Sequence, residues 1–169
     1  VSRLLNQPAA ERTVATIIHE VTHQLAFNSG LQTRYADNPG WVSEGIATYF
    51  ESPSLTTTRG WNAVGKMNRF NLFYFRRSLQ QQPGTRLPGL LSADAAFQDP
   101  GAVRQAYAES WALTYFLLKT RAPQYCDYIK RLSSQSPLQQ IGSDERKAIF
   151  RASFGTDLAE MEEEWMRYM

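Results

Sequence analysis

Apolar residues recur every three or four positions along most of this chain, as they do on the buried face of an α-helix. The spacing predicts helices over residues 10–27, 41–51, 61–82, 102–120, 123–134, 143–153 and 156–168. No alternation of apolar and polar residues demands a β-strand, although Thr56–Thr58 could form one. We therefore predict a mainly α protein with little or no β-sheet, folded as a single helical domain over residues 1–169.

Helix-breaking residues mark where several of these helices end. Asn28-Ser29-Gly30 is a typical C-terminal stop for the first one. The segment 83–101 contains Pro83, Pro88 and Pro100, so we expect only one short helix there, near Ala93–Phe97.

Composition and charge exclude several classes of protein. The longest nearly unbroken apolar stretch, Trp111–Leu118, is far shorter than the ~20 residues of a membrane span. With 18 basic and 16 acidic residues the chain is too balanced to indicate nucleic acid or anionic lipid as a partner. One cysteine, Cys126, rules out an intrachain disulfide. Val1-Ser2-Arg3 has no initiating Met and no apolar leader follows, so we expect a piece of a longer protein whose targeting is not visible.

The only two histidines of the chain, His19 and His23, lie four residues apart within the first predicted helix. Residues at this spacing share one face of a helix, about 6 Å apart at Cβ. Two imidazoles placed in this way can bind one Zn²⁺ ion. The apolar neighbours Ile17, Ile18, Val21 and Leu25 indicate that the motif helix is buried or lines a cleft.

Glu20 lies between the two histidines, in a position where it would serve as a base rather than as a ligand. Zinc lowers the pKa of a bound water toward ~7, and a nearby carboxylate can take its proton as the water attacks a carbonyl. His-Glu-x-x-His on a helix is the arrangement that zinc metallopeptidases use. The sequence thus predicts one Zn²⁺ ion with Glu20 as the general base.

A catalytic zinc site needs a third protein ligand, and Glu44 is the best donor in the sequence. It follows His23 by 21 residues, which is enough for a loop that returns a second helix beside the first. Glu51 lies two turns further along the same face, and we interpret it as a surface residue, or else as one that supports a ligand.

These motifs resemble the gluzincin metallopeptidases, in which His-Glu-x-x-His is followed by a glutamate ligand on the next helix. The matching residues here are His19–His23 and Trp41-x-x-Glu44-Gly45-x-Ala47-x-Tyr49. More narrowly, the chain resembles bacterial peptidase-MA-like domains of unknown function, which also carry a segment like Tyr107–Leu113 (Tyr-Ala-Glu-Ser-Trp-Ala-Leu).

The resemblance implies a zincin-like catalytic core that hydrolyses peptide or protein substrates. It makes His19, His23 and Glu44 the metal ligands and Glu20 the general base. It also implies an extracytoplasmic or periplasmic location. Gly45, next to the third ligand, would let the two helices that carry the metal approach closely.

An oxyanion-stabilising group is also needed in such a site. Tyr107 is the residue that the matching segment suggests, with Tyr115 as an alternative, and both could instead be core aromatics. Arg76 and Arg77 could hold a substrate carboxylate, but we interpret them as surface charges.

The chain departs from the family pattern at its start. Gluzincins usually carry a β-sheet before the motif helix, and an edge strand of that sheet holds the substrate. Only 18 residues precede His19 here. We therefore expect these residues to bind the metal but to position a peptide poorly, with a possible upstream domain of the same chain. Two further readings stay open: a zinc-binding helical module that binds a protein partner without turnover, and a metal-free helical interaction domain.

Overall fold

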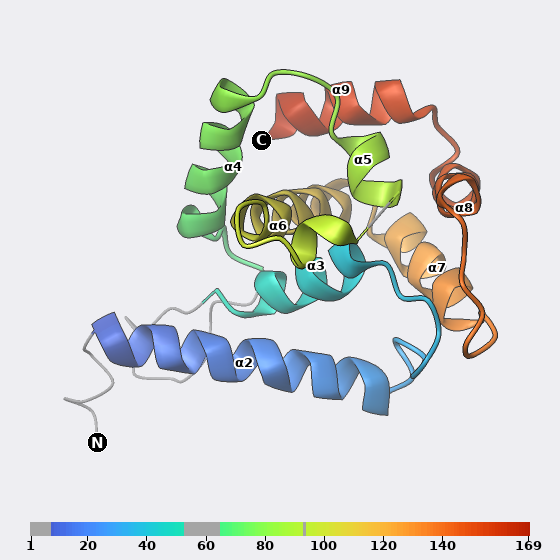
Figure 1. Cartoon of the computed structure of the whole chain (residues 1–169), viewed down its shortest axis with the longest axis horizontal. Helices are drawn as coiled ribbons and strands as arrows, with labels where there is room; N and C mark the ends of the chain where they lie inside the picture. The colour runs from blue at the N-terminus through green and yellow to red at the C-terminus, as the bar shows by residue number, and fades with distance from the viewer. Residues whose placement is uncertain (1–7, 53–64, 93) are drawn as a thin grey trace.

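The computed structural model describes residues 8–52, 65–92 and 94–169, and of residues 8–12 only the backbone (Figure 1). Within these ranges the chain is helical and contains no strand, which confirms the mainly α prediction. The elements are α2 (Pro8–Asn28), α3 (Gly40–Phe50), α4 (Arg69–Gln81), α5 (Leu87–Ser92), the short 3₁₀ helix η1 (Ala95–Phe97), α6 (Val103–Thr120), α7 (Ala122–Ser133), α8 (Ser143–Phe154) and α9 (Leu158–Tyr168). No helix among the described residues is both long and apolar enough to cross a bilayer.

Helix α6 is the centre of the fold. It is the most deeply buried helix, and α3 and α4 make their most extensive contacts with it. Figure 1 looks nearly along α6, with α3 below it, α4 on one side and α7 and α8 on the other. The predicted position of this helix, 102–120, is correct to within one residue.

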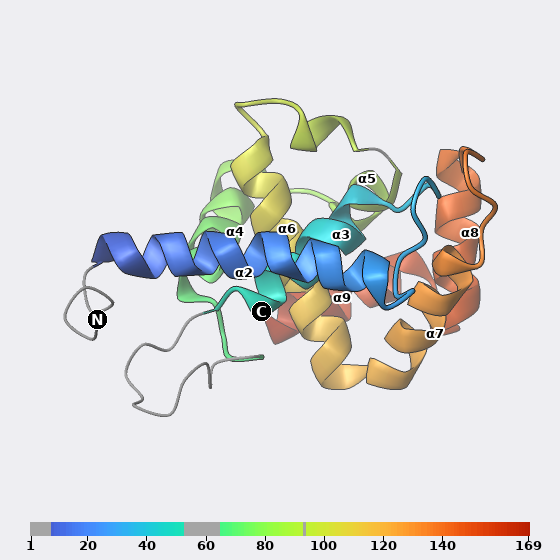
Figure 2. The same cartoon turned by 90° about the horizontal axis from the view of Figure 1, so that it is seen from below.

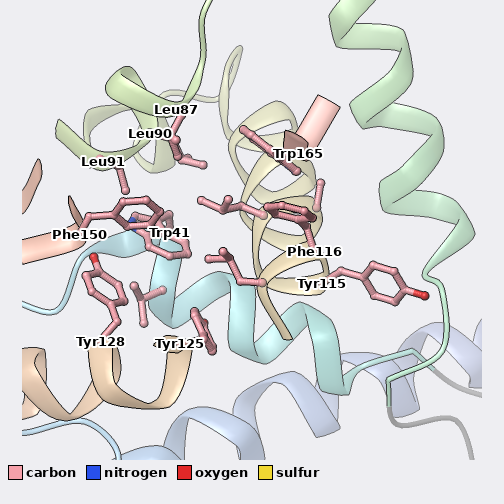
Figure 3. Close-up of a cluster of buried hydrophobic side chains, with 14 of the residues drawn as sticks. Trp41, Leu87, Leu90, Leu91, Tyr115, Phe116, Tyr125, Tyr128, Phe150 and Trp165 are labelled. Atoms are coloured by element: carbon pink, nitrogen blue, oxygen red, sulfur yellow. The ribbon is translucent and has the colours of Figure 1, made fainter. Parts of the chain in front are cut away.

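Aromatic rings fill the core between these helices (Figure 3). Trp41, in the first turn of α3, stacks on Tyr128 with ring centroids 5.7 Å apart, and its edge meets Phe150 at 6.1 Å. All three rings are fully buried. Because a buried aromatic side chain contributes several kcal/mol to stability, this cluster fixes the start of α3, one turn before Glu44.

Gly45 lets α3 approach α6 more closely than any other residue would. A Cβ atom at this position would lie 2.2 Å from Oγ1 of Thr114 and 2.7 Å from the main-chain oxygen of Ser110. The close approach that the sequence suggested at Gly45 therefore exists, but it joins α3 to α6 rather than to α2. Its effect is to hold the helix that carries Glu44 tightly against the core.

We expect Gly45→Ala to destabilise the protein by about 2–3 kcal/mol, because the added methyl meets main-chain atoms of α6 that cannot move aside alone. Chemical denaturation would measure the change in the free energy of unfolding. Gly89→Ala in α5 is the matched control, since a Cβ there meets nothing within 4 Å and alanine favours a helix. Equal stability of the Gly45 and Gly89 variants would contradict this account.

Helix α2 lies on the outside of the bundle and packs mainly on α3, as Figure 2 shows from below. Its apolar stripe is not buried: Ile17, Val21 and Leu25 are 56%, 47% and 62% exposed. The expectation of burial is therefore wrong for these three residues, whereas Ile18 is half-buried. Positions two apart in a helix differ by about 200°, so when His19 faces α3, Ile17 and Val21 must face away from it.

The segment between α4 and α6 differs from the prediction. Helix α4 begins only at Arg69, where Asn68 caps it by accepting a hydrogen bond from the backbone N–H of Asn71. Two short helices, α5 and η1, replace the single one expected near Ala93–Phe97. Pro88 lies in the first turn of α5, where a proline removes no helical hydrogen bond, so it did not exclude that helix. Residues 61–64, Thr56–Thr58 and Ala93 lie outside the described residues.

Candidate metal centre

The three residues predicted as metal ligands lie together where α2 crosses α3. Nε2 of His19 is 3.1 Å from Nε2 of His23, on the same face of α2. Oε2 of Glu44, from α3, is 3.1 Å from Nε2 of His19 and 3.6 Å from Nε2 of His23. The helix spacing brings the imidazoles together, and the anchored start of α3 brings the carboxylate to them.

The distances between these donor atoms fit a small divalent cation. Zinc–ligand bonds of about 2.0–2.1 Å in tetrahedral geometry separate neighbouring ligand atoms by about 3.3 Å. Two imidazole nitrogens and one carboxylate oxygen are also a usual donor set for a catalytic zinc ion. Hydrogen bonds alone account for the cluster less well, because one proton on Nε2 of His19 cannot be donated to both His23 and Glu44.

Glu51, which follows α3 directly, is hydrogen-bonded to the His19 ring at Nδ1, the nitrogen that faces away from His23 and Glu44. Its Oε2 atom lies 3.0 Å from Nδ1 of His19, and its Oε1 atom accepts a hydrogen bond of 3.4 Å from Asn68. Since an ionised carboxylate can only accept, Nδ1 of His19 carries the proton and donates it. In the neutral ring, Nε2 is then left with its lone pair facing His23 and Glu44, as a metal ligand requires.

The charges within the cluster shift two pKa values strongly. Burial on its own would lower the pKa of His19, but hydrogen bonds to Glu44 and Glu51 and their charges outweigh it and raise this pKa to about 9. Burial would likewise raise the pKa of Glu44, but hydrogen bonds from His19 and His23 and their charges lower it to about 2. The carboxylate therefore stays ionised at any pH where the protein would work, ready to bind a cation.

Tyr107, in α6, is the aromatic residue that reaches this cluster. The centroid of its ring lies 6.0 Å from that of His19, and Phe97 of η1 supports the ring at 5.9 Å. Burial raises the pKa of Tyr107 to about 12, together with the charge of Glu44 and a hydrogen bond to it. The hydroxyl therefore keeps its proton and acts as a donor.

Tyr115, the alternative to Tyr107, lies in the core. Its ring packs against Trp111, Tyr49 and Tyr168 at centroid distances of 5.3–6.3 Å. No contact among the described residues joins it to the ligand cluster.

Glu20 lies beside the cluster without being part of it. Its side chain is exposed, although it follows a buried ligand, because successive residues in a helix differ in direction by about 100°. Its negative charge also contributes to the raised pKa of Tyr107, so the two side chains lie near enough to interact.

A second charged cluster, which the sequence did not indicate, fixes the start of α3. Asp94 accepts a 2.7 Å hydrogen bond from the backbone N–H of Gly40 and pairs with Arg146 at 2.9 Å. Arg146 also pairs with Asp37 at 2.5 Å. The buried guanidinium therefore ties the loop before α3 and the segment before η1 to α8, and this holds Glu44 in place from a distance.

The candidate ligands, Glu20, Glu51 and Tyr107 all lie within one recognised family region. The family described as "Protein of unknown function (DUF1570)" matches residues 13–139. No match to the chain is found among curated proteins or among solved structures.

Proposed function

We propose that this chain, which belongs to the family described as "Protein of unknown function (DUF1570)", is a zinc-dependent peptidase of the gluzincin type. The observation that carries the proposal is the convergence of His19, His23 and Glu44 with donor atoms 3.1–3.6 Å apart. One Zn²⁺ ion would be held by these three side chains, with peptides or proteins as substrates.

The remaining groups have the properties that peptide hydrolysis needs. Zinc, when bound, would supply a Lewis acid that activates water and polarises the substrate carbonyl. Glu20 is exposed beside the cluster, and its carboxylate would accept a proton from the attacking water and pass it to the leaving amine. The Tyr107 hydroxyl stays protonated well above neutral pH, so it can donate a hydrogen bond to the developing oxyanion.

A second candidate function is a zinc-binding module that binds a protein partner and turns over substrate slowly or not at all. The exposed stripe of Ile17, Val21 and Leu25 beside the motif favours it, since contiguous exposed apolar side chains often mark an interaction surface. The described residues also contain no strand that could pair with an extended peptide. Against it stands Glu20, because a purely structural site has no use for a base there.

Metal content and hydrolysis, measured on the same purified protein, test both candidates. We expect one zinc ion per chain, cleavage of a fluorogenic peptide library, loss of cleavage with a chelator, and recovery when zinc is returned. Zinc at one equivalent without any cleavage would favour the binding module. A protein that binds no zinc would rule out both.

We expect Glu51→Ala to weaken zinc binding by about 10–100-fold, as is usual when the residue that orients a ligand histidine is removed. Without Glu51, the His19 ring can rotate and its Nε2 atom loses basicity. Competition with a chromogenic chelator would measure the dissociation constant. Glu51→Gln retains an acceptor for Nδ1–H and should lose less, whereas Glu163→Gln, exposed on α9, should lose nothing. An unchanged affinity in Glu51→Ala would show that this carboxylate does not support the metal.

A further inference from the structure

Arg104, in the first turn of α6, is an exposed arginine held against two aromatic rings. Its guanidinium carbon lies 4.9 Å from the centroid of the Tyr74 ring and 5.9 Å from that of Phe70, both in α4. None of the ion pairs found among the described residues includes Arg104. By contrast, buried or half-buried carboxylates neutralise three arginines of the described residues, Arg86, Arg121 and Arg146.

Two separate connections, each through a neighbouring residue, link this arginine to the candidate metal centre. Arg104 lies one helical turn before Tyr107, on the same side of α6, and Tyr107 contacts the ligand cluster. On the other helix, Phe70 follows Asn68 by two residues, and Asn68 donates to Glu51. Figure 2 shows α4 beside the N-terminal half of α6, in agreement with the extensive contacts between these two helices.

The aromatic contacts prepare Arg104 to bind an anion. A guanidinium stacked over aromatic faces is held in place by cation–π attraction, while the N–H groups at its edge stay free. Such an edge matches a carboxylate, which it can bind through two parallel hydrogen bonds. The rings thus reduce the entropy that a long side chain loses on binding.

The negative charges of the site indicate what Arg104 could do for an anionic substrate. Glu44 and Glu51 contact His19, and Glu20 lies beside the cluster, so the site carries three carboxylates. A bound Zn²⁺ ion would balance two of these charges and leave one that repels a negatively charged substrate group. Arg104 provides a fixed positive charge at the edge of that field. A peptide with a carboxylate near the cleaved bond would therefore be selected over one without it.

We propose that Arg104 binds a carboxylate of the substrate and so makes this site specific for peptides that carry one. The carboxylate belongs either to an acidic side chain or to the peptide's own C-terminus. This inference rests on the proposed peptidase function, and its test must not depend on turnover.

Binding to the zinc-loaded Glu20→Gln protein, in which the proposed base is absent, provides that test. Three fluorescently labelled probes are compared by anisotropy: tetra-alanine with a free C-terminal carboxylate, its C-terminal amide, and the amide with one alanine replaced by glutamate. We expect one of the two carboxylate probes to bind roughly 10- to 100-fold more tightly than the plain amide. The probe that is preferred identifies the source of the carboxylate.

Substitution of Arg104 in the Glu20→Gln protein decides whether this residue causes the preference for a carboxylate probe. Arg104→Gln should remove the preference, and Arg104→Lys should keep only part of it, because an ammonium group cannot form the paired hydrogen bonds. Arg151→Gln, exposed on α8, should keep all of it. Thermal unfolding of each variant would confirm that the fold is retained.

The outcomes separate this inference from the proposed function. A carboxylate preference that survives Arg104→Gln overturns the assignment of Arg104, even if the wild-type protein hydrolyses peptides. Equal binding of all three probes, or binding of none, overturns it as well. A preference that depends on Arg104, in a protein that cleaves nothing, supports the inference and overturns the peptidase.

Discussion

Glu20→Gln should abolish peptide hydrolysis while leaving one zinc ion bound. The substitution keeps the size of the side chain and removes its ability to accept a proton, for which general-base catalysis contributes typically 10²–10⁴-fold. Zinc should stay bound because Glu20 is exposed and none of the three converging donor atoms belongs to it. Initial rates with a fluorogenic peptide and metal analysis of the same sample would measure both effects.

Glu145→Gln is the matched control for this change, since Glu145 is an exposed helical glutamate on α8. It should leave both the rate and the metal content unchanged. A Glu20→Gln protein that cleaves as fast as the wild type would contradict the mechanism, whatever its zinc content. Loss of zinc together with activity would instead mean that Glu20 is a ligand, which the geometry does not support.

The helices could be predicted because their signal is local. Apolar spacing located α6 and most of the shorter helices to within one or two residues. Helix α5 was missed because proline at 88 was given the weight of a helix breaker, although a first-turn proline is tolerated. For all of these helices, the residues that determine where the helix begins and ends are close neighbours in the sequence.

Which face of a helix is buried depends on distant parts of the chain, and the buried face of α2 was predicted wrongly. Ile17, Val21 and Leu25 form the apolar stripe of α2, yet the face that packs on α3 carries His19, His23 and Ala26. A small residue and two imidazoles allow α2 to approach Glu44, which an aliphatic stripe would prevent. The usual rule that the most apolar face of a helix is buried therefore does not hold for α2 among the described residues.

In the candidate site, too, some residues could be predicted from the local sequence and others depend on contacts with distant parts of the chain. His19, His23 and Glu44 are recognisable from spacing and residue type alone. The sequence indicated Glu51 only weakly, because it lies on the same face as Glu44 two turns later. Its hydrogen-bond partner, His19, is 32 residues away along the chain. The sequence did not indicate Arg104, since its significance comes from aromatic rings on another helix.

Glu44→Gln should weaken zinc binding by more than 100-fold, which exceeds the ~10–100-fold effect of losing a residue that only supports a ligand. The amide keeps the shape of the side chain, but it lacks the negative charge that compensates the cation. His19 and His23 alone would leave the ion with two protein ligands, fewer than a catalytic zinc site has. Equilibrium dialysis against a zinc buffer would measure the dissociation constant, with Glu163→Gln as the control.

The pH dependence of zinc binding provides a second test of the Glu44→Gln variant. In the wild-type protein the pKa of His19 is about 9, so a proton must leave as zinc binds. The affinity for zinc should therefore rise with pH until about pH 9. Glu44 is one of the two carboxylates that raise this pKa, so in Glu44→Gln the rise should end at a lower pH. If the variant instead bound zinc as tightly as the wild type, with the same pH dependence, the metal would lie elsewhere in the protein.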